Sequence, residues 1–143
     1  MYDTARGPAK FMVGCARAIE EMGFDSVLLV DHIAIPPDDA DGSGARYVDV
    51  LSRLAWLDGI TQRVNPGSGV LILPYLAGPP TAKQIATIQE LSGNRLLMGM
   101  GIGWMPLEFE AFGLNRHARG RVSDETLAFL NDCFANDEME ANG

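Results

Sequence analysis

The chain is poor in the residue types on which several protein classes depend. Of its 143 residues only two are cysteines, Cys15 and Cys133, and neither has a second cysteine or a histidine at metal-ligand spacing. We therefore expect two reduced, buried thiols, no disulfide and no metal site. The N-terminus has no apolar segment typical of a signal peptide, and no apolar run approaches the roughly 18 residues of a membrane-spanning helix. These absences predict a soluble, cytoplasmic protein.

Basic residues are also scarce, with 11 Lys and Arg against 19 Asp and Glu, for a net charge of -8. Proteins that bind nucleic acid need clustered Lys and Arg to neutralise phosphates. The one basic cluster here is short and comprises Arg116, His117, Arg119 and Arg121. We expect neither nucleic acid nor a membrane as a partner. The motifs G-x-x-x-x-G-K-[ST], H-E-x-x-H and G-x-S-x-G are all missing, so P-loop, zinc-protease and hydrolase functions lack support.

What the chain does contain is an ordinary globular composition, 47% hydrophobic and 21% charged, and an alternation of helix and strand patterns. Apolar runs that do not alternate with polar residues predict strands covered on both faces. The predicted strands are 26–30, 69–73 and 95–100, with a turn at 65–67 and a loop at 36–46. The predicted helices are 8–22, one starting after Asp49 as N-cap, one from about Pro80 to Leu91, 106–112, and a last one carrying Val122 to Cys133.

Connections of this length suit parallel βαβ units, so the predicted fold class is α/β, with about three parallel strands flanked by helices. We expect one domain over residues 1–143. Its acidic tail, residues 131–143, is expected to fray.

The carboxyl ends of parallel strands are where such folds place their sites. Asp31 and His32 follow the first predicted strand. An imidazole there can transfer a proton near neutral pH, and a neighbouring carboxylate can fix its tautomer. Alternatively, Asp31 caps the following loop and His32 packs beneath it. The sequence leaves both interpretations open.

Glycines occupy positions 99, 101 and 103 at the end of the third predicted strand. The dinucleotide fingerprint G-x-G-x-x-G fails, because Trp104 stands where its last glycine should be. Glycines at alternate positions leave one strand face without side chains, so a ligand ring or an adjacent helix can approach the backbone. Gly69, at the start of the second strand, indicates either a bulge or a plain tight turn.

Other polar and aromatic residues have two interpretations each. Arg119 and Arg121 can clamp an anion, or they can form a solvated helix start in which Arg121 pairs with Asp124 or Glu125. Trp104, Trp56 and Tyr75 are either core or rim aromatics, or platforms for a stacked ring.

Together these patterns resemble the luciferase-like monooxygenase superfamily, in its branch that uses FMN or the deazaflavin F420. The segments that carry the resemblance are 23–27 (Gly-Phe-Asp-Ser-Val), 31–32 (Asp-His), 69–74 (Gly-Val-Leu-Ile-Leu-Pro), 91–96 (Leu-Ser-Gly-Asn-Arg-Leu) and 99–104 (Gly-Met-Gly-Ile-Gly-Trp), with Glu108 and Phe109. Their order and spacing match from about residue 10 to 130.

The resemblance implies a TIM-type barrel that holds an isoalloxazine-like ring at its strand ends. It implies His32 as the proton-transferring residue with Asp31 orienting it. It also implies a non-proline cis peptide at Gly69-Val70, and a ring lined by Gly69, Val70, Gly101, Gly103 and Trp104. Some F420 enzymes carry a glutamate where this chain has Trp104, so the resemblance does not favour a sugar-phosphate dehydrogenase.

The same resemblance implies that this chain corresponds to part of a barrel. A TIM barrel takes about 250 residues, and the family's first strand and the C-terminal half of its barrel have no counterpart here. Open sheet edges and an uncovered apolar face favour pairing between chains. We therefore expect a homo-oligomer that acts as an oxidoreductase on a small-molecule substrate. The alternative is a non-catalytic, self-associating relative that binds cofactor weakly or not at all.

Overall fold

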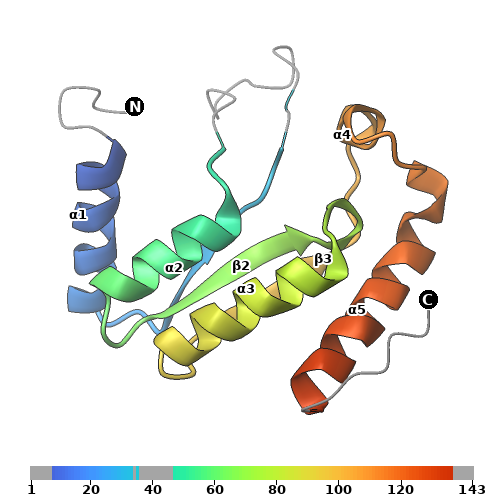
Figure 1. The fold of residues 1–143 in the computed structure, drawn as a ribbon. Helices are drawn as coiled ribbons and strands as arrows, with labels where there is room; N and C mark the ends of the chain where they lie inside the picture. The colour runs from blue at the N-terminus through green and yellow to red at the C-terminus, as the bar shows by residue number, and fades with distance from the viewer. Residues whose placement is uncertain (1–7, 34, 36–46, 137–143) are drawn as a thin grey trace.

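A computed structural model describes residues 8–33, 35 and 47–136 of the chain (Figure 1). Helices and strands alternate as the sequence predicts. In chain order the elements are α1 (Pro8–Glu21), β1 (Ser26–Leu29), α2 (Val50–Ile60), β2 (Asn65–Ile72), the 3-10 helix η2 (Leu73–Tyr75), α3 (Gly78–Leu91), β3 (Leu97–Gly101), α4 (Pro106–Ala111), the 3-10 helix η3 (Arg116–Ala118) and α5 (Arg119–Ala135). The predicted α/β class with three parallel strands is confirmed.

The three strands form one parallel sheet in the order β1-β2-β3. Helices α2 and α3 run side by side against the sheet (Figure 1), and α5 packs against α3 and η2. The core lies between these helices and one face of the sheet, and it includes Leu54, Leu71, Ile85 and Leu130. Burial of these side chains is the main source of stability, at about 1.5–3 kcal/mol for each fully buried side chain.

The other face of the sheet is uncovered among the described residues, as expected for part of a barrel, whereas the apolar runs taken alone predicted strands covered on both faces. In β1, Leu29 is buried while the side chain of Leu28 is 57% exposed. Val30 and Leu97 are also exposed. A continuous apolar run cannot distinguish a strand covered by this chain from one whose second face needs other cover.

The turn predicted at residues 65–67 is also wrong, because these residues begin β2 and pair with Ser26 to Leu28 of β1. Pro66 is the second residue of the strand and precedes Gly67, where the pairing of β2 with β3 begins, so its missing N–H leaves that pairing intact. Gly67 serves close packing: a Cβ there would lie 2.7 Å from the Leu28 side chain and 2.7 Å from the carbonyl oxygen of Leu97. The glycine therefore lets three strands approach one another, and does not mark a turn.

Local helix signals fare better. Asp49 caps α2 as predicted, its carboxylate accepting a hydrogen bond of 2.7 Å from the Ser52 N–H. Gly23 follows α1 with a φ of 79°, the left-handed conformation expected at a helix C-terminus. Helix α5 continues to Ala135, inside the segment expected to fray, and the loop 36–46 and residues 137–143 lie outside the described residues.

The predicted burial of the two cysteines is wrong for Cys15, which is exposed. Cys133 is partly buried. The apolar spacing of the first predicted helix places Cys15 on its inner face, whereas between residues 10 and 21 of that helix Ala16 alone is fully buried.

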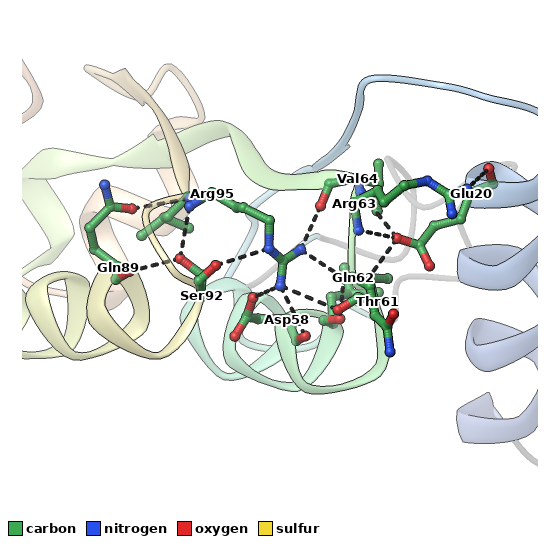
Figure 2. Close-up of polar contacts among 11 residues, drawn as sticks. Glu20, Asp58, Thr61, Gln62, Arg63, Val64, Gln89, Ser92 and Arg95 are labelled. Carbon is green, nitrogen blue, oxygen red and sulfur yellow. Dashed lines mark hydrogen bonds and ion pairs between the residues drawn. The ribbon is translucent and has the colours of Figure 1, made fainter.

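A polar network fixes the amino ends of the strands (Figure 2). The Arg95 guanidinium, just before β3, forms an ion pair with the buried carboxylate of Asp58 on α2. It also donates to the carbonyl oxygens of Val64 at 2.7 Å and Ser92 at 2.9 Å. One side chain thus links the end of α2, the entry to β2 and the end of α3.

Glu20 extends the network to α1 (Figure 2). Its carboxylate accepts hydrogen bonds from the backbone N–H groups of Gln62, Arg63 and Val64 at 2.8, 2.6 and 3.1 Å. These hydrogen bonds, which favour the charged form, lower the pKa of Glu20 to about 2. The amino ends of the sheet are therefore set by charge-assisted contacts, which leaves the carboxyl ends to carry the candidate site.

Candidate active site at the carboxyl ends of the strands

His32 lies three residues beyond the end of β1, beside two aromatic side chains. Its ring centroid is 4.9 Å from that of Tyr47 and 6.4 Å from that of Trp104, both in edge-on geometry. Trp104 follows β3 and is 63% exposed. Two of the residues predicted from separate strand ends, His32 and Trp104, thus come together.

Glu108, on α4, is the hydrogen-bonding partner of this histidine. Its Oε1 lies 3.2 Å from His32 Nδ1 and accepts a 2.7 Å hydrogen bond from the Ile33 N–H. Its Oε2 accepts a 3.1 Å hydrogen bond from the Tyr75 hydroxyl. The side chain is 1% exposed. Burial and the Glu108 charge raise the pKa of Tyr75, so its hydroxyl stays protonated and remains a donor.

Sequence reasoning missed this role, because Glu108 stood out only as part of the family resemblance. A usable signal was present: an acidic residue in the first turn of a short helix that directly follows a strand end points back toward that end.

The resemblance implied that Asp31 orients His32, whereas the carboxylate that the structure places against the His32 ring is that of Glu108. Asp31 is buried, and burial raises the pKa of its carboxyl, as do the charges of Asp49 and Glu108 to a smaller extent. A hydrogen bond from the backbone of Ile72, at the end of β2, partly opposes these effects. The charge of His32 also lowers the pKa of Asp31, as the smallest of these effects.

The peptide bond between Gly69 and Val70 is cis, as the resemblance implied. The register between β2 and β3 shifts between Gly69 and Leu71, so the bulge interpretation of Gly69 is the right one. The Val70 side chain is 40% exposed on the open face of the sheet.

The glycines of β3 make room for this bulge. A Cβ on Gly101 would lie 2.5 Å from Val70 Cγ2, and one on Gly99 would collide with the carbonyl oxygen of Ser68. Gly103 has a φ of +70°, and a Cβ there would lie 2.8 Å from Ile72 Cγ2. What approaches the glycine backbone is therefore the neighbouring strand β2, which neither of the two sequence-based alternatives named.

The remaining candidates are structural. Arg121 forms the expected ion pair with Glu125, at 2.7 Å between exposed side chains. Arg119 donates to the carbonyl oxygen of Arg116. Trp56 packs against the core, and Tyr75 stacks on Phe112 with ring centroids 4.9 Å apart.

The described part of the chain also has a large cavity away from these strand ends. It measures about 830 Å³ and lies between α3, β3 and α5, lined among others by Met98, Met100, Leu127 and Phe134. Nothing in its lining offers a catalytic pair comparable to His32 and Glu108. Residues 8–33, 35 and 47–136 contain no group of three or more His, Cys, Asp or Glu that could hold a metal ion. Across the same ranges, every helix falls short of the length and hydropathy that a membrane span requires.

Comparison with known families gives a match over residues 1–143 to the luciferase-like monooxygenase family. The chain belongs to this family. An uncharacterized family relative from Mycobacterium tuberculosis strain H37Rv is 28% identical over 99% of this chain and 54% of its own length. The F420-dependent glucose-6-phosphate dehydrogenase of Amycolatopsis mediterranei is 29% identical over 96% of this chain and 41% of its own length. The chain therefore spans about half the length of these luciferase-like relatives, or less.

Among solved structures, the oxygenating constituent of 3,6-diketocamphane monooxygenase from Pseudomonas putida, a type II Baeyer-Villiger monooxygenase in complex with FMN, superposes with a TM-score of 0.81. It is 16% identical in sequence, and the match covers 98% of this chain and 38% of that one. At this identity the likeness concerns the fold, which is that of luciferase-like TIM-barrel proteins over part of their length.

Proposed function

We propose that this chain carries the ring-binding and proton-transfer part of a flavin- or F420-dependent oxidoreductase site. The observation that carries the proposal is the meeting of His32 and Trp104 at the strand ends, in a luciferase-like chain whose β2 bulge exposes Val70. A relative that is F420-dependent and a structural neighbour in complex with FMN support the choice of cofactor class.

The side chains present fit a flat, largely apolar ring. The Val70 side chain covers the backbone of Gly101. The bulge therefore presents to a ligand an exposed apolar surface, the Val70 ledge, and not hydrogen-bonding groups. Ile102 and Trp104 continue this exposed surface beyond β3. When bound, such a ring supplies the capacity to accept or donate a hydride, which no side chain here provides. Val70 and Trp104 would hold it, and His32 is the group able to exchange a proton beside it.

The chain's own contribution is orientation and proton transfer. His32 is partly buried between Tyr47 and Trp104, which restricts its ring to a narrow range of positions.

A fluorescence titration tests this proposal. In the Trp56→Phe variant, Trp104 is the one remaining tryptophan, so its emission reports directly on the site. We expect saturable quenching of Trp104 by FMN or by F420. Val70→Asp should abolish the quenching by placing a charge on the ledge, whereas Leu127→Asp, which adds the same charge at an exposed apolar position on α5, should not. If neither cofactor quenches Trp104 saturably, the proposal is wrong for this chain.

A second candidate function follows from the uncovered sheet face: the chain is a non-catalytic relative that associates with a second copy of itself. Leu28, Val30 and Leu97 expose apolar side chains on that face, and burial of apolar surface of this kind drives association.

Sedimentation velocity distinguishes this second candidate from the first. A dimer that dissociates in Leu28→Asp, combined with an absence of cofactor quenching at Trp104, favours the non-catalytic function. The exposed position Met22, at the end of α1, provides a matched control as Met22→Asp, which should leave the dimer intact. A monomer in the unmodified chain excludes self-association.

A further inference from the structure

We propose that Glu108 is a positioning residue that fixes the tautomer and orientation of His32, so that Nε2 is the nitrogen presented to substrate or ring. The proposal deepens the function proposed above and rests on it for its catalytic meaning. The arrangement itself is a property of the chain without cofactor, and can be tested in that state.

The first argument is burial. Glu108 is 1% exposed, and a buried carboxylate is tolerated only when hydrogen bonds replace its water. Both of its oxygens have donors, Oε1 from the Ile33 N–H and Oε2 from the Tyr75 hydroxyl. These contacts leave the carboxylate little freedom to rotate, so its position relative to His32 is fixed by three separate segments of the chain.

The second argument concerns the proton on His32. An ionised carboxylate only accepts hydrogen bonds, so the 3.2 Å contact with Oε1 requires the hydrogen on Nδ1. A neutral imidazole carries a single N–H, and Nε2 is then an unprotonated acceptor. Glu108 thereby selects the nitrogen that can take up a proton. Charge-assisted hydrogen bonds of this kind are about twice as strong as neutral ones.

The third argument is that Tyr75, which donates to the Glu108 carboxylate, is itself held in place by aromatic packing. Tyr75 packs edge-on to Phe109, with ring centroids 5.0 Å apart, and stacks on Phe112 at 4.9 Å. Phe109 lies on α4 next to Glu108, and Phe112 is its C-terminal cap. Since the pKa of Tyr75 is raised, it remains a donor across ordinary pH. The carboxylate and its anchor are therefore held by the same short helix.

Long-range ¹H–¹⁵N NMR correlation on chain labelled at histidine tests the proposal without cofactor. The chain has two histidines, and the exposed His117 is removed by His117→Gln to leave His32 alone. At a pH where the ring is neutral, we expect the Nδ1–H tautomer to exceed the Nε2–H tautomer by about tenfold or more, as a hydrogen bond to a charged group allows. A dominant Nε2–H tautomer overturns the proposal at once.

Variants separate positioning from a merely structural role. Glu108→Leu should give a mixture of both tautomers, whereas Glu108→Gln should keep Nδ1–H, because its amide oxygen still accepts, while shifting the Nδ1 proton resonance upfield as the charge is lost. The exposed Glu110 on the same helix provides the control, since neither Glu110→Leu nor Glu110→Gln should change the His32 signals.

The outcome remains decisive if Glu108→Leu does not fold. An Nδ1 proton resonance that is unchanged in Glu108→Gln overturns the proposal. The proposal is also overturned if Glu108→Gln and Tyr75→Phe both give the histidine spectrum of the parent. Failure of FMN or F420 to bind leaves these spectra unaffected, so it refutes the proposed function alone. A fixed Nδ1–H tautomer that is lost in Glu108→Leu supports the positioning role whichever cofactor the chain takes.

Discussion

Replacing Arg95 with methionine should destabilise the fold more than any other single change in the amino-end network. The side chain of Arg95 is partly buried and forms the ion pair with Asp58, whose side chain is 7% exposed. Methionine keeps much of the aliphatic stem but removes every hydrogen-bond donor. The Asp58 carboxylate and the carbonyl oxygens of Val64 and Ser92 then lose their guanidinium partner.

The expected cost is about 3 kcal/mol in the free energy of unfolding. Removing one partner of a buried ion pair costs about 3–5 kcal/mol, and the lower end applies because the Arg95 side chain is 18% exposed and the pair is therefore not fully buried. With a urea m-value of about 2 kcal/mol per M, the unfolding midpoint should fall by about 1.5 M. Urea titrations followed by far-UV circular dichroism measure the change.

Two further variants make the test specific. Arg63→Met removes an exposed arginine that donates one hydrogen bond to the Glu20 carbonyl oxygen, and its cost should stay within about 1 kcal/mol. Arg95→Met combined with Asp58→Leu should recover stability, because an apolar pair no longer leaves a buried charge unpaired. A cost below about 1 kcal/mol for Arg95→Met, or strict additivity in the double variant, would refute the reasoning.

Three other predictions concern stability. The folded-state pKa of Glu20, about 2, lies below its ordinary value of 4.5. Its contribution to the free energy of unfolding is therefore complete above pH 4.5 and disappears as the pH falls through 2. Acid unfolding of Glu20→Gln should lack this part of the pH dependence, and an acid-unfolding curve identical to that of the parent contradicts the assignment. Asp49→Ala should cost about 1 kcal/mol by removing the cap of α2, measured as a lower melting temperature, whereas Asp49→Asn should keep most of it. Gly101→Ala should destabilise the chain through the clash with Val70, and Val70→Ala should relieve it in the double variant; equal urea midpoints for parent and Gly101→Ala count against a packing role.

The parts of the fold that the sequence predicts are those governed by local chemistry. Asp49 caps α2 and Gly23 ends α1, because a side-chain acceptor and a left-handed residue act within one helical turn. The cis peptide at Gly69-Val70 was implied only by family resemblance, and no local pattern indicates it. The helix and strand order followed from hydrophobic periodicity alone.

What could not be predicted depends on segments far apart in the sequence. The prediction of a turn at 65–67 was wrong because Gly67 is needed for close packing against Leu28 and Leu97, which come from the two neighbouring strands. The family resemblance implied Asp31 as the residue that orients His32, whereas Glu108 lies 76 residues away from His32 in sequence and becomes its neighbour only once α4 folds back over the strand ends. At a strand end the side chains of adjacent residues can point in different directions, whereas side chains from distant segments can meet, and the sequence alone does not show which ones do.

The network around Arg95 and Glu20 has a consequence for how this chain can change. It sets strand register from one end of the sheet, with contacts that do not involve the residues around His32. Substitutions among Tyr47, Trp104 and their neighbours can therefore alter what the strand ends bind without moving the strands themselves. For protein engineering, the amino ends of the strands hold the fold in place and the carboxyl ends form the candidate site. Variant libraries confined to the carboxyl ends should therefore contain many folded members.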